Sequence, residues 1–198
     1  DISLGGGNDN INSAKFVYND SLDAGAGDDT IYIMVGGGSG TPSFSNLNMT
    51  KLDGGAGIDT LAFEESTTGG AEINLSRGGA VNFENLIGTS AGEVVRGDTG
   101  NNVLSGKGGA DTIYGGNGND TLYADSLSEL NGSAIASSSS TNDELYGEVG
   151  DDTLVGSAGD NTLDGGTGAD TLITGNGSDT IIIRAGDGGS DEASADTI

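Results

Sequence analysis

The sequence lacks several residue types on which common protein chemistries depend. It contains no cysteine and no histidine, and its only proline is Pro42. Without cysteine, disulfides and thiolate metal sites are excluded, and without histidine the commonest general base and the usual zinc ligand are missing. Basic side chains are also scarce, with 6 Lys and Arg against 31 Asp and Glu, which gives a formal net charge of −25. This charge repels phosphate backbones and anionic lipids, so we expect cations as partners and no nucleic acid.

Long hydrophobic runs are absent as well. The longest apolar run extends only from Ile31 to Val35, so we expect no membrane insertion. Glycine is abundant, with 39 of 198 residues, but there is no steady Gly-X-Y period and almost no proline, which excludes collagen. The length suits a single domain. The chain starts at Asp1 without a methionine or a cleavable signal and stops in mid-pattern at Ile198, so we expect a segment of a longer protein.

A nine-residue repeat dominates what is present. Residues 54–62, 115–123 and 165–173 are three copies of the same unit. With its positions numbered 1 to 9, eleven units start at residues 4, 24, 54, 88, 97, 106, 115, 147, 156, 165 and 174. Position 4 is Gly in ten units, position 7 is Thr in eight, and position 8 is aliphatic in all eleven. Such regular repetition predicts units that stack on one another.

Each position of the unit has a physical interpretation. Glycine at positions 1, 2 and 4 permits positive φ, so positions 1 to 6 are predicted to form a turn. Positions 7 to 9 then form a short strand whose position 8 side chain points inward. The predicted core is thin and consists of Leu104, Ile113, Leu122, Leu154, Leu163, Leu172 and Ile181. The expected fold class is therefore all-β, and several units must stack before any of them is stable.

Position 6 carries an acidic residue in most units. It is Asp at residues 9, 29, 59, 111, 120, 152, 170 and 179, Asn at residues 102 and 161, and Glu at residue 93. Carboxylates and carbonyl oxygens on a Gly-rich loop are the hard ligands that calcium prefers. The alternative is that Gly-Asn-Asp loops are only good turn formers in a metal-free solenoid.

The units resemble the glycine- and aspartate-rich nonapeptide G-G-x-G-x-D-x-U-x of the RTX (repeats-in-toxin) family. The resemblance implies a right-handed parallel β-roll, with two nonapeptides per turn and several calcium ions bound between successive turns. It assigns the side-chain ligands to Asp9, Asp29, Asp59, Asn102, Asp111, Asp120, Asp152, Asn161, Asp170 and Asp179. It assigns backbone carbonyl ligands to Gly106, Gly109, Gly115, Gly118, Gly147, Gly150, Gly156, Gly159, Gly165 and Gly168.

Some units depart from the repeat. Asn102 and Asn161 carry no charge, so we expect weaker ion binding there. The unit with Glu93 lacks two glycines and is expected to lead into the array without binding an ion. Asp9, Asp29 and Asp59 lie in units whose neighbours are out of phase, so their sites are expected to be incomplete.

The phase of the repeat divides the chain into six segments. They are irregular units over 1–62 with a loop insertion at 35–51, a hairpin-like spacer over 63–87, a first regular run over 88–123, a Ser-rich insertion over 124–146, a second regular run over 147–182, and an out-of-phase end over 183–198. The insertion at 124–146 is either a tolerated solvent loop or a contact surface, and the solvent loop is favoured. The outward row of position 7 threonines suggests ice or sugar binding, but β-propensity explains it better because position 9 is mixed.

Three functions are compatible with this interpretation of the sequence. The favoured one is a calcium-binding structural module that folds on extracellular calcium, within a secreted surface protein of adhesin or surface-layer type. The alternative is the secretion and folding tail of a secreted enzyme or toxin whose catalytic domain lies elsewhere. A catalytic role for the segment itself is disfavoured, because its carboxylates follow the repeat and no separate pocket-forming domain is visible.

The resemblance also implies a location and a route. Export through a type I secretion channel suits a chain that is unfolded where calcium is scarce, and the expected location is extracellular, at the cell surface. Besides calcium, the expected partners are neighbouring copies, other surface proteins or polysaccharide.

Overall fold

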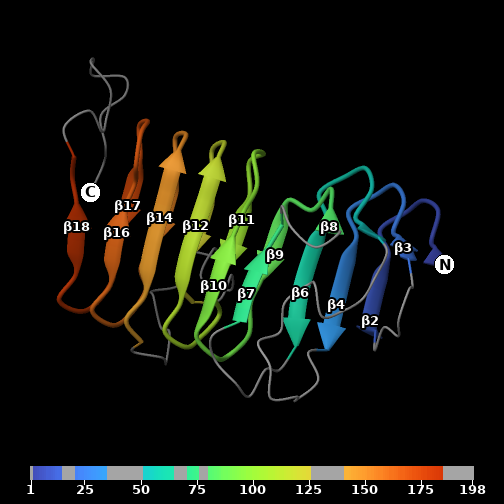
Figure 1. Cartoon of the computed structure of the whole chain (residues 1–198), viewed down its shortest axis with the longest axis horizontal. Helices are drawn as coiled ribbons and strands as arrows, with labels where there is room; N and C mark the ends of the chain where they lie inside the picture. Colours follow the sequence, from blue (N-terminus) through green and yellow to red (C-terminus); the bar gives the residue numbers. More distant parts are fainter. Residues whose placement is uncertain are drawn as a thin grey trace.

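The computed structural model of the protein describes residues 2–14, 21–34, 51–64, 71–75, 80–125 and 141–184. Within these ranges every regular element is a β-strand and none is a helix, which confirms the all-β prediction. Accordingly, the described residues provide no helix that is long and apolar enough to cross a membrane. The strands follow one another along the long axis of the molecule, from the N-terminus to the C-terminal β18 (Figure 1).

The strands form three parallel sheets. The largest has eight strands, in the spatial order β17 (Thr171–Ile173), β15 (Thr153–Val155), β13 (Thr121–Tyr123), β11 (Val103–Ser105), β9 (Asn85–Ile87), β6 (Thr60–Glu64), β4 (Thr30–Met34) and β2 (Asn10–Ala14). The second has six, in the order β18 (Thr180–Ile182), β16 (Thr162–Asp164), β14 (Glu144–Val149), β12 (Thr112–Asn117), β10 (Glu93–Arg96) and β7 (Ala71–Asn74). The third has four, in the order β1 (Ile2–Ser3), β3 (Ser21–Asp23), β5 (Lys51–Asp53) and β8 (Ala80–Val81).

Successive units alternate between facing sheets, so two nonapeptides complete one coil. The strand of each unit pairs with the strand two units away, as in Leu104↔Leu122 and Leu122↔Leu154. Every strand pair is parallel. The parallel β-roll predicted from the repeat is therefore confirmed.

The core is one row of position 8 side chains from each sheet. Leu104, Ile113, Leu122, Leu154 and Leu163 have no exposed surface, as predicted. Leu172 is 4% exposed, and Ile181 is partly buried against the same cluster. Because each coil adds only two or three such side chains, a single coil buries too little apolar surface to be stable alone.

The hairpin predicted within 63–87 does not form. β7 pairs with β10 in the six-stranded sheet, whereas β8 pairs with β5 in the four-stranded sheet. The alternation of apolar residues that suggested two antiparallel strands belongs instead to two parallel strands of different sheets. Their apolar faces are buried by stacking on other coils, which alternation within a segment cannot distinguish from a hairpin.

The insertion at 124–146 is shorter than predicted. Glu144–Val149 forms β14, which lies between β12 and β16, with Leu145 fully buried. Residues 141–146 therefore belong to the roll, as the second half of a further nonapeptide. The serine-rich centre at 137–140 lies outside the described residues.

The N-terminal units are in register in spite of their irregular spacing. β2, β4, β6 and β9 pair in sequence, with Ile31↔Leu61 and Leu61↔Leu86 directly opposite. The longer intervals are thus coils with longer connections, and the stacking continues through them. The predicted loop at 35–51 lies outside the described residues up to residue 50, and the predicted out-of-phase end lies outside them beyond residue 184.

Candidate metal centre

The position 6 side chains form two rows, one along each edge of the roll. Within each row, the backbone N–H at position 6 donates to the side-chain oxygen of the position 6 residue in the next coil. Examples are Asp120 N–H to Asp152 Oδ1 at 2.7 Å and Asp111 N–H to Asp143 Oδ1 at 2.7 Å. The row before the eight-stranded sheet contains Asp9, Asp29, Asp59, Glu84, Asn102, Asp120, Asp152 and Asp170. The row before the six-stranded sheet contains Glu93, Asp111, Asp143, Asn161 and Asp179.

All ten predicted side-chain ligands thus lie in the two rows, although Asn102 Oδ1 accepts from Asp98 N–H of its own turn and not from the preceding coil. Asp9, Asp29 and Asp59 are included, because Asp29 Oδ1 accepts from Asp9 N–H at 2.7 Å and Asp59 Oδ1 accepts from Asp29 N–H at 2.8 Å. Their stacking is continuous, contrary to the expectation from the sequence phase. Whether each position holds an ion stays a prediction.

The second carboxylate oxygen has no donor in most aspartates of these rows. Oδ2 is buried without a hydrogen-bond partner in Asp9, Asp29, Asp59, Asp111, Asp120 and Asp152. The position 1 glycine leaves room for it: a Cβ on Gly115 would lie 2.5 Å from Asp120 Oδ2, and a Cβ on Gly106 would overlap Asp111 Oδ2. A buried carboxylate oxygen without a donor is costly, so this site requires a positive partner.

Asn161 shows what surrounds that oxygen. Its Oδ1 accepts from Asp143 N–H at 2.9 Å, as the aspartates do. Its Nδ2 donates to the carbonyls of Gly156 and of Gly159, the latter at 3.3 Å. The carbonyl oxygens of positions 1 and 4 therefore converge on the second atom of the position 6 side chain. In a unit with aspartate at position 6, the second atom is the carboxylate Oδ2. It faces the carbonyl oxygens of positions 1 and 4, and no donor corresponds to Nδ2 of Asn161.

Carbonyls of neighbouring coils also face the space between them. Gly147 O lies against position 1 of the preceding coil, 2.7 Å from a Cβ placed on Gly115, and Gly118 O lies against Gly150 of the following coil. Contacts of the same kind involve the carbonyls of Gly106, Gly115, Gly150, Gly159 and Gly165. Gly109 and Gly168 occupy position 4 of their turns with φ of 101° and 142°.

Hard oxygen ligands of this kind suit calcium, which accepts six to eight of them in flexible geometry. The described residues contain no group of three or more acidic side chains placed to hold an ion by themselves. An ion between coils must therefore take several of its ligands from the turn carbonyls, as the convergence at Asn161 indicates.

Burial changes the acidity of these carboxyl groups. It raises the pKa of Asp111 to about 8, of Asp152 to about 7 and of Asp120 to about 6. Neighbouring acids add to the effect, with Glu93 and Asp143 acting on Asp111 and Asp120 and Asp170 acting on Asp152. A nearby cation would oppose both causes, because it favours the charged form.

The two asparagines are bonded differently from the aspartates, and their role as weaker oxygen ligands stays a prediction. Asn102 Oδ1 accepts from Asp98 N–H at 2.9 Å, and its Nδ2 donates to Glu84 O at 3.4 Å. At Asn161 the amide nitrogen, not the oxygen, faces the turn carbonyls. In this arrangement both amides are satisfied by the protein itself, and Asn161 presents no oxygen to an ion.

Glu93 is also satisfied internally. Its carboxylate accepts from the hydroxyl of Thr89 at 2.5 Å and from Thr89 N–H at 3.1 Å. Thr89 replaces the position 2 glycine and supplies the donors that other turns lack. Whether this unit leads into the array without holding an ion stays a prediction.

Sequence reasoning missed Asp143, Glu84 and Asp125. Asp143 is 1% exposed, belongs to the second row and has its pKa raised by burial to about 6. The only sign of it in the sequence is Asp143 followed by Leu145 and Gly147, without the preceding glycines. Glu84 Oε2 accepts from Asp59 N–H at 2.8 Å and continues the first row. Asp125 is 2% exposed, and its charge acts on Asp111 and Asp143.

A second pair of rows runs outside the first, at position 5. Here the direction is reversed, because the later coil donates to the earlier one, as in Asp151 N–H to Asn119 Oδ1 at 3.1 Å. The accepting residues are Asn8, Asp28, Asn101, Asn119, Asn142, Asp151 and Asp160. These exposed bonds tie neighbouring turns together without an ion, which explains the preference for Asn and Asp before position 6.

Comparison with known proteins gives one match. The family model of the RTX calcium-binding nonapeptide repeat matches in four copies, at residues 17–32, 87–126, 146–181 and 155–192, which together cover about half of the chain. No curated protein matches the chain.

Proposed function

Since the chain belongs to the RTX calcium-binding nonapeptide-repeat family, we propose that it is a structural module that folds when it meets extracellular calcium, as part of a larger surface protein of adhesin or surface-layer type. RTX repeats bind calcium, and proteins that carry them are generally secreted. The ion number, the surface location and the parent protein belong to the proposal.

The observation that carries the proposal is the unpartnered, buried Oδ2 of aspartates such as Asp111, Asp120 and Asp152. Calcium between coils would be held by these oxygens together with the carbonyls of position 1 and position 4 glycines. It would take the place that the Nδ2 donor of Asn161 occupies in its own turn. Without it, rows of carboxylates repel one another across a thin core, so the roll is poorly stabilised.

Calcium that binds only the folded state stabilises it by mass action. In the cytosol, where calcium is scarce, an acidic Gly-rich chain of this kind stays unfolded, which suits passage through a type I secretion channel. Outside the cell, calcium at about 1 mM is within the range that extracellular modules bind. Folding would thus follow export.

Limited proteolysis tests the folding step. We expect proteinase K to leave a stable core at about 1 mM calcium and to degrade the chain in chelator. Equal resistance in both conditions would contradict the proposal.

An antibody against this chain tests the surface location. Labelling of intact source cells supports a surface module. Recovery of the antigen only from the culture medium, joined to an enzyme domain, would support the secretion and folding tail instead.

A further inference from the structure

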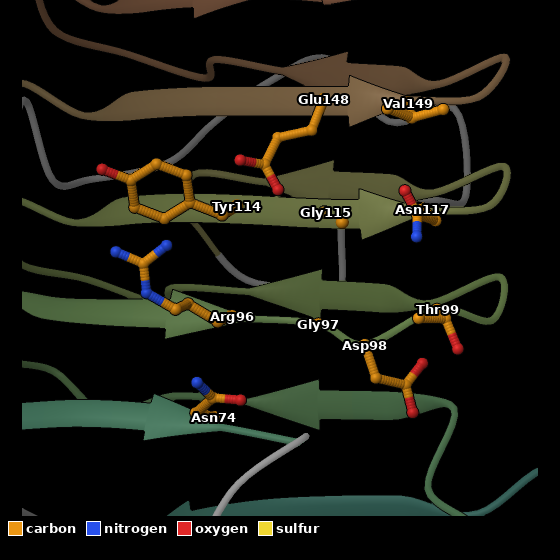
Figure 2. Close-up of a pocket in the computed structure, with 11 residues that line it drawn as sticks. Asn74, Arg96, Gly97, Asp98, Thr99, Tyr114, Gly115, Asn117, Glu148 and Val149 are labelled. Carbon is orange, nitrogen blue, oxygen red and sulfur yellow. The ribbon is translucent and has the colours of Figure 1, made fainter.

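A hollow of about 430 Å³ lies on the outer face of the six-stranded sheet, beside the turns that follow β10 and β12 (Figure 2). Gly97, Gly115 and Gly116 line it without side chains, and the backbone of Gly97 and Gly116 is partly exposed there. Figure 2 shows Arg96 and Tyr114 on one side and Thr99 and Asn117 on the other, with Glu148 reaching over from the next strand. No position 6 side chain lines the hollow, although it borders the first row at the position 1 glycines Gly97 and Gly115.

One wall of the hollow is a rigid column of stacked side chains. Register places Arg96, Tyr114 and Tyr146 directly opposite one another at position 9 of successive strands. The Arg96 guanidinium lies 3.8 Å from the centre of the Tyr114 ring, and Tyr114 stacks on Tyr146 with ring centres 5.0 Å apart. Glu72 Oε1, 3.4 Å from Arg96 Nε, holds the guanidinium from the other side.

A second hollow, of about 280 Å³, continues the first along the roll. The two share Tyr114 and Glu148, and the second is also lined by Asp164, Thr167 and Arg184. Together they extend from Asn74 on β7 to Asp164 on β16, across five strands. At about 4.8 Å per strand, this groove is roughly 19 Å long and runs across the strands.

Glu148 lies in the groove and has the left-handed backbone that position 2 also takes at Lys107 and Ser157. It has φ of 76°, where the equivalent residues of the adjacent coils, Gly116 and Gly166, are glycines. A non-glycine residue in this region is strained by the order of 1 kcal/mol. Its side chain is exposed and makes no hydrogen bond or ion pair within the described part of the chain, so packing does not account for it.

The composition of the groove restricts what it can bind. Asp98, Glu148 and the net charge of −25 oppose an anionic ligand. Arg96 and Arg184 oppose a purely cationic one. Hydroxyl groups both donate and accept hydrogen bonds, so they match a mixture of Arg, Asn, Thr, Tyr, Asp and Glu side chains. Arg and Tyr are also enriched in recognition surfaces, and this chain has only 5 Tyr and 6 basic residues in all.

We propose that this groove binds a neutral oligosaccharide chain, with Glu148 and Asp98 accepting hydrogen bonds from sugar hydroxyls and Asn117 and Arg96 donating to them. The rigid Tyr114 column forms the side against which the chain lies. This activity goes beyond the calcium-dependent folding proposed above, although it requires the folded roll.

Saturation-transfer NMR tests the proposal on the full chain in calcium. The probes are neutral tetrasaccharides of glucose, mannose, galactose, xylose or N-acetylglucosamine, each measured separately. We expect at least one of them to bind, with a Kd of about 0.1–1 mM because the groove is open. Circular dichroism of the same samples reports whether the roll is folded, so failure of folding and failure of sugar binding are distinguished.

Glu148→Gly and Asn117→Thr are the groove variants. Each introduces the residue that the same position carries in the unit of Gly166 and Thr167, so the fold tolerates them. We expect each to weaken binding at least fivefold. Ile173→Thr, on an exposed residue of the other sheet, is the matched control and should leave binding unchanged. No binding of any probe, binding that survives both groove variants, or binding only of a uronate chain or a basic peptide would overturn the proposal.

Discussion

At the scale of single residues, Asp152 and Asn161 make the same backbone contact but direct different atoms into their turns. In both, Oδ1 accepts the N–H of the preceding coil, at 2.7 Å for Asp152 and 2.9 Å for Asn161. The second atom is an oxygen without a donor in Asp152 and a donating nitrogen in Asn161. Because one atom differs, we expect the aspartate turn to need calcium or a proton and the asparagine turn to need neither.

Asn161→Asp is therefore expected to create an additional calcium site. Without calcium it should lower the free energy of unfolding by about 1–3 kcal/mol, because a satisfied buried group becomes unsatisfied. With calcium, isothermal titration should detect about one more bound ion per chain than in the parent. Asp120→Asn is the reverse control and should bind about one ion fewer. An unchanged ion number in both variants would show that position 6 does not hold calcium.

At the scale of the element, each nonapeptide combines a turn that must remain open with a strand that must be apolar on one side. Gly115 lies close to Asp120 Oδ2 and to Gly147 O of the next coil, so its missing side chain is what admits the carboxylate. Leu122, seven residues later, has no exposed surface. A substitution in the turn is therefore expected to disturb the carboxylate site, and a substitution in the strand to disturb the core.

Gly115→Ala is expected to impair the turn. Its Cβ would lie 2.5 Å from Asp120 Oδ2 and 2.7 Å from Gly147 O, and both neighbours are fixed by the stack. We expect a loss of about 1–3 kcal/mol and a higher calcium concentration for folding. Gly108→Ala is the control, since its Cβ would meet nothing closer than 3.9 Å. Equal stability of the two variants in urea unfolding would contradict the assigned turn geometry.

Leu122→Asp is expected to prevent folding even in excess calcium. The change places a charge in the stacked core, between Leu104 and Leu154, at a cost of several kcal/mol. Thr121→Asp, at the half-exposed neighbour, should fold. Far-UV circular dichroism compares them. A Leu122→Asp chain with the parent spectrum would refute the inward direction of position 8.

At the scale of the whole molecule, the roll is a thin core enclosed by acidic edges. Calcium and protons both relieve the same repulsion, because both remove negative charge from the rows. We therefore expect folding to depend on calcium or on protons.

Acid should accordingly replace calcium in part. Burial raises the folded-state pKa of Asp120, Asp152 and Asp111 to about 6, 7 and 8, from an ordinary value of 3.8. A raised pKa contributes stability that is complete below the unfolded value and is lost as pH rises through the folded value. In chelator, we expect more β-structure at pH 5 than at pH 8. The calcium midpoint should be higher at pH 6 than at pH 8, since protons compete for the carboxylates. A calcium-free chain that is equally folded at both pH values would contradict this.

Much of the roll was predictable because every repeat unit carries the turn and strand residues that make the units stack. Position 8 predicted the core and position 6 predicted most members of the two rows, because both positions are set by local turn and strand chemistry. β7 and β8 were not predictable, since their partners lie in other coils at variable sequence distances. Asp143 was missed because its unit lacks the glycines. The orientation of the Asn161 amide is set by the N–H of Asp143. The repeat pattern does not include Asp143, so it could not predict this orientation.

The calcium dependence of the far-UV circular dichroism spectrum tests the central claim most directly. We expect a disordered spectrum in chelator at pH 8 and a cooperative gain of β signal on addition of calcium, with no comparable gain from magnesium, which favours a rigid octahedral site. A β-rich spectrum in chelator that calcium leaves unchanged would mean a metal-independent solenoid in which the position 6 aspartates only form turns.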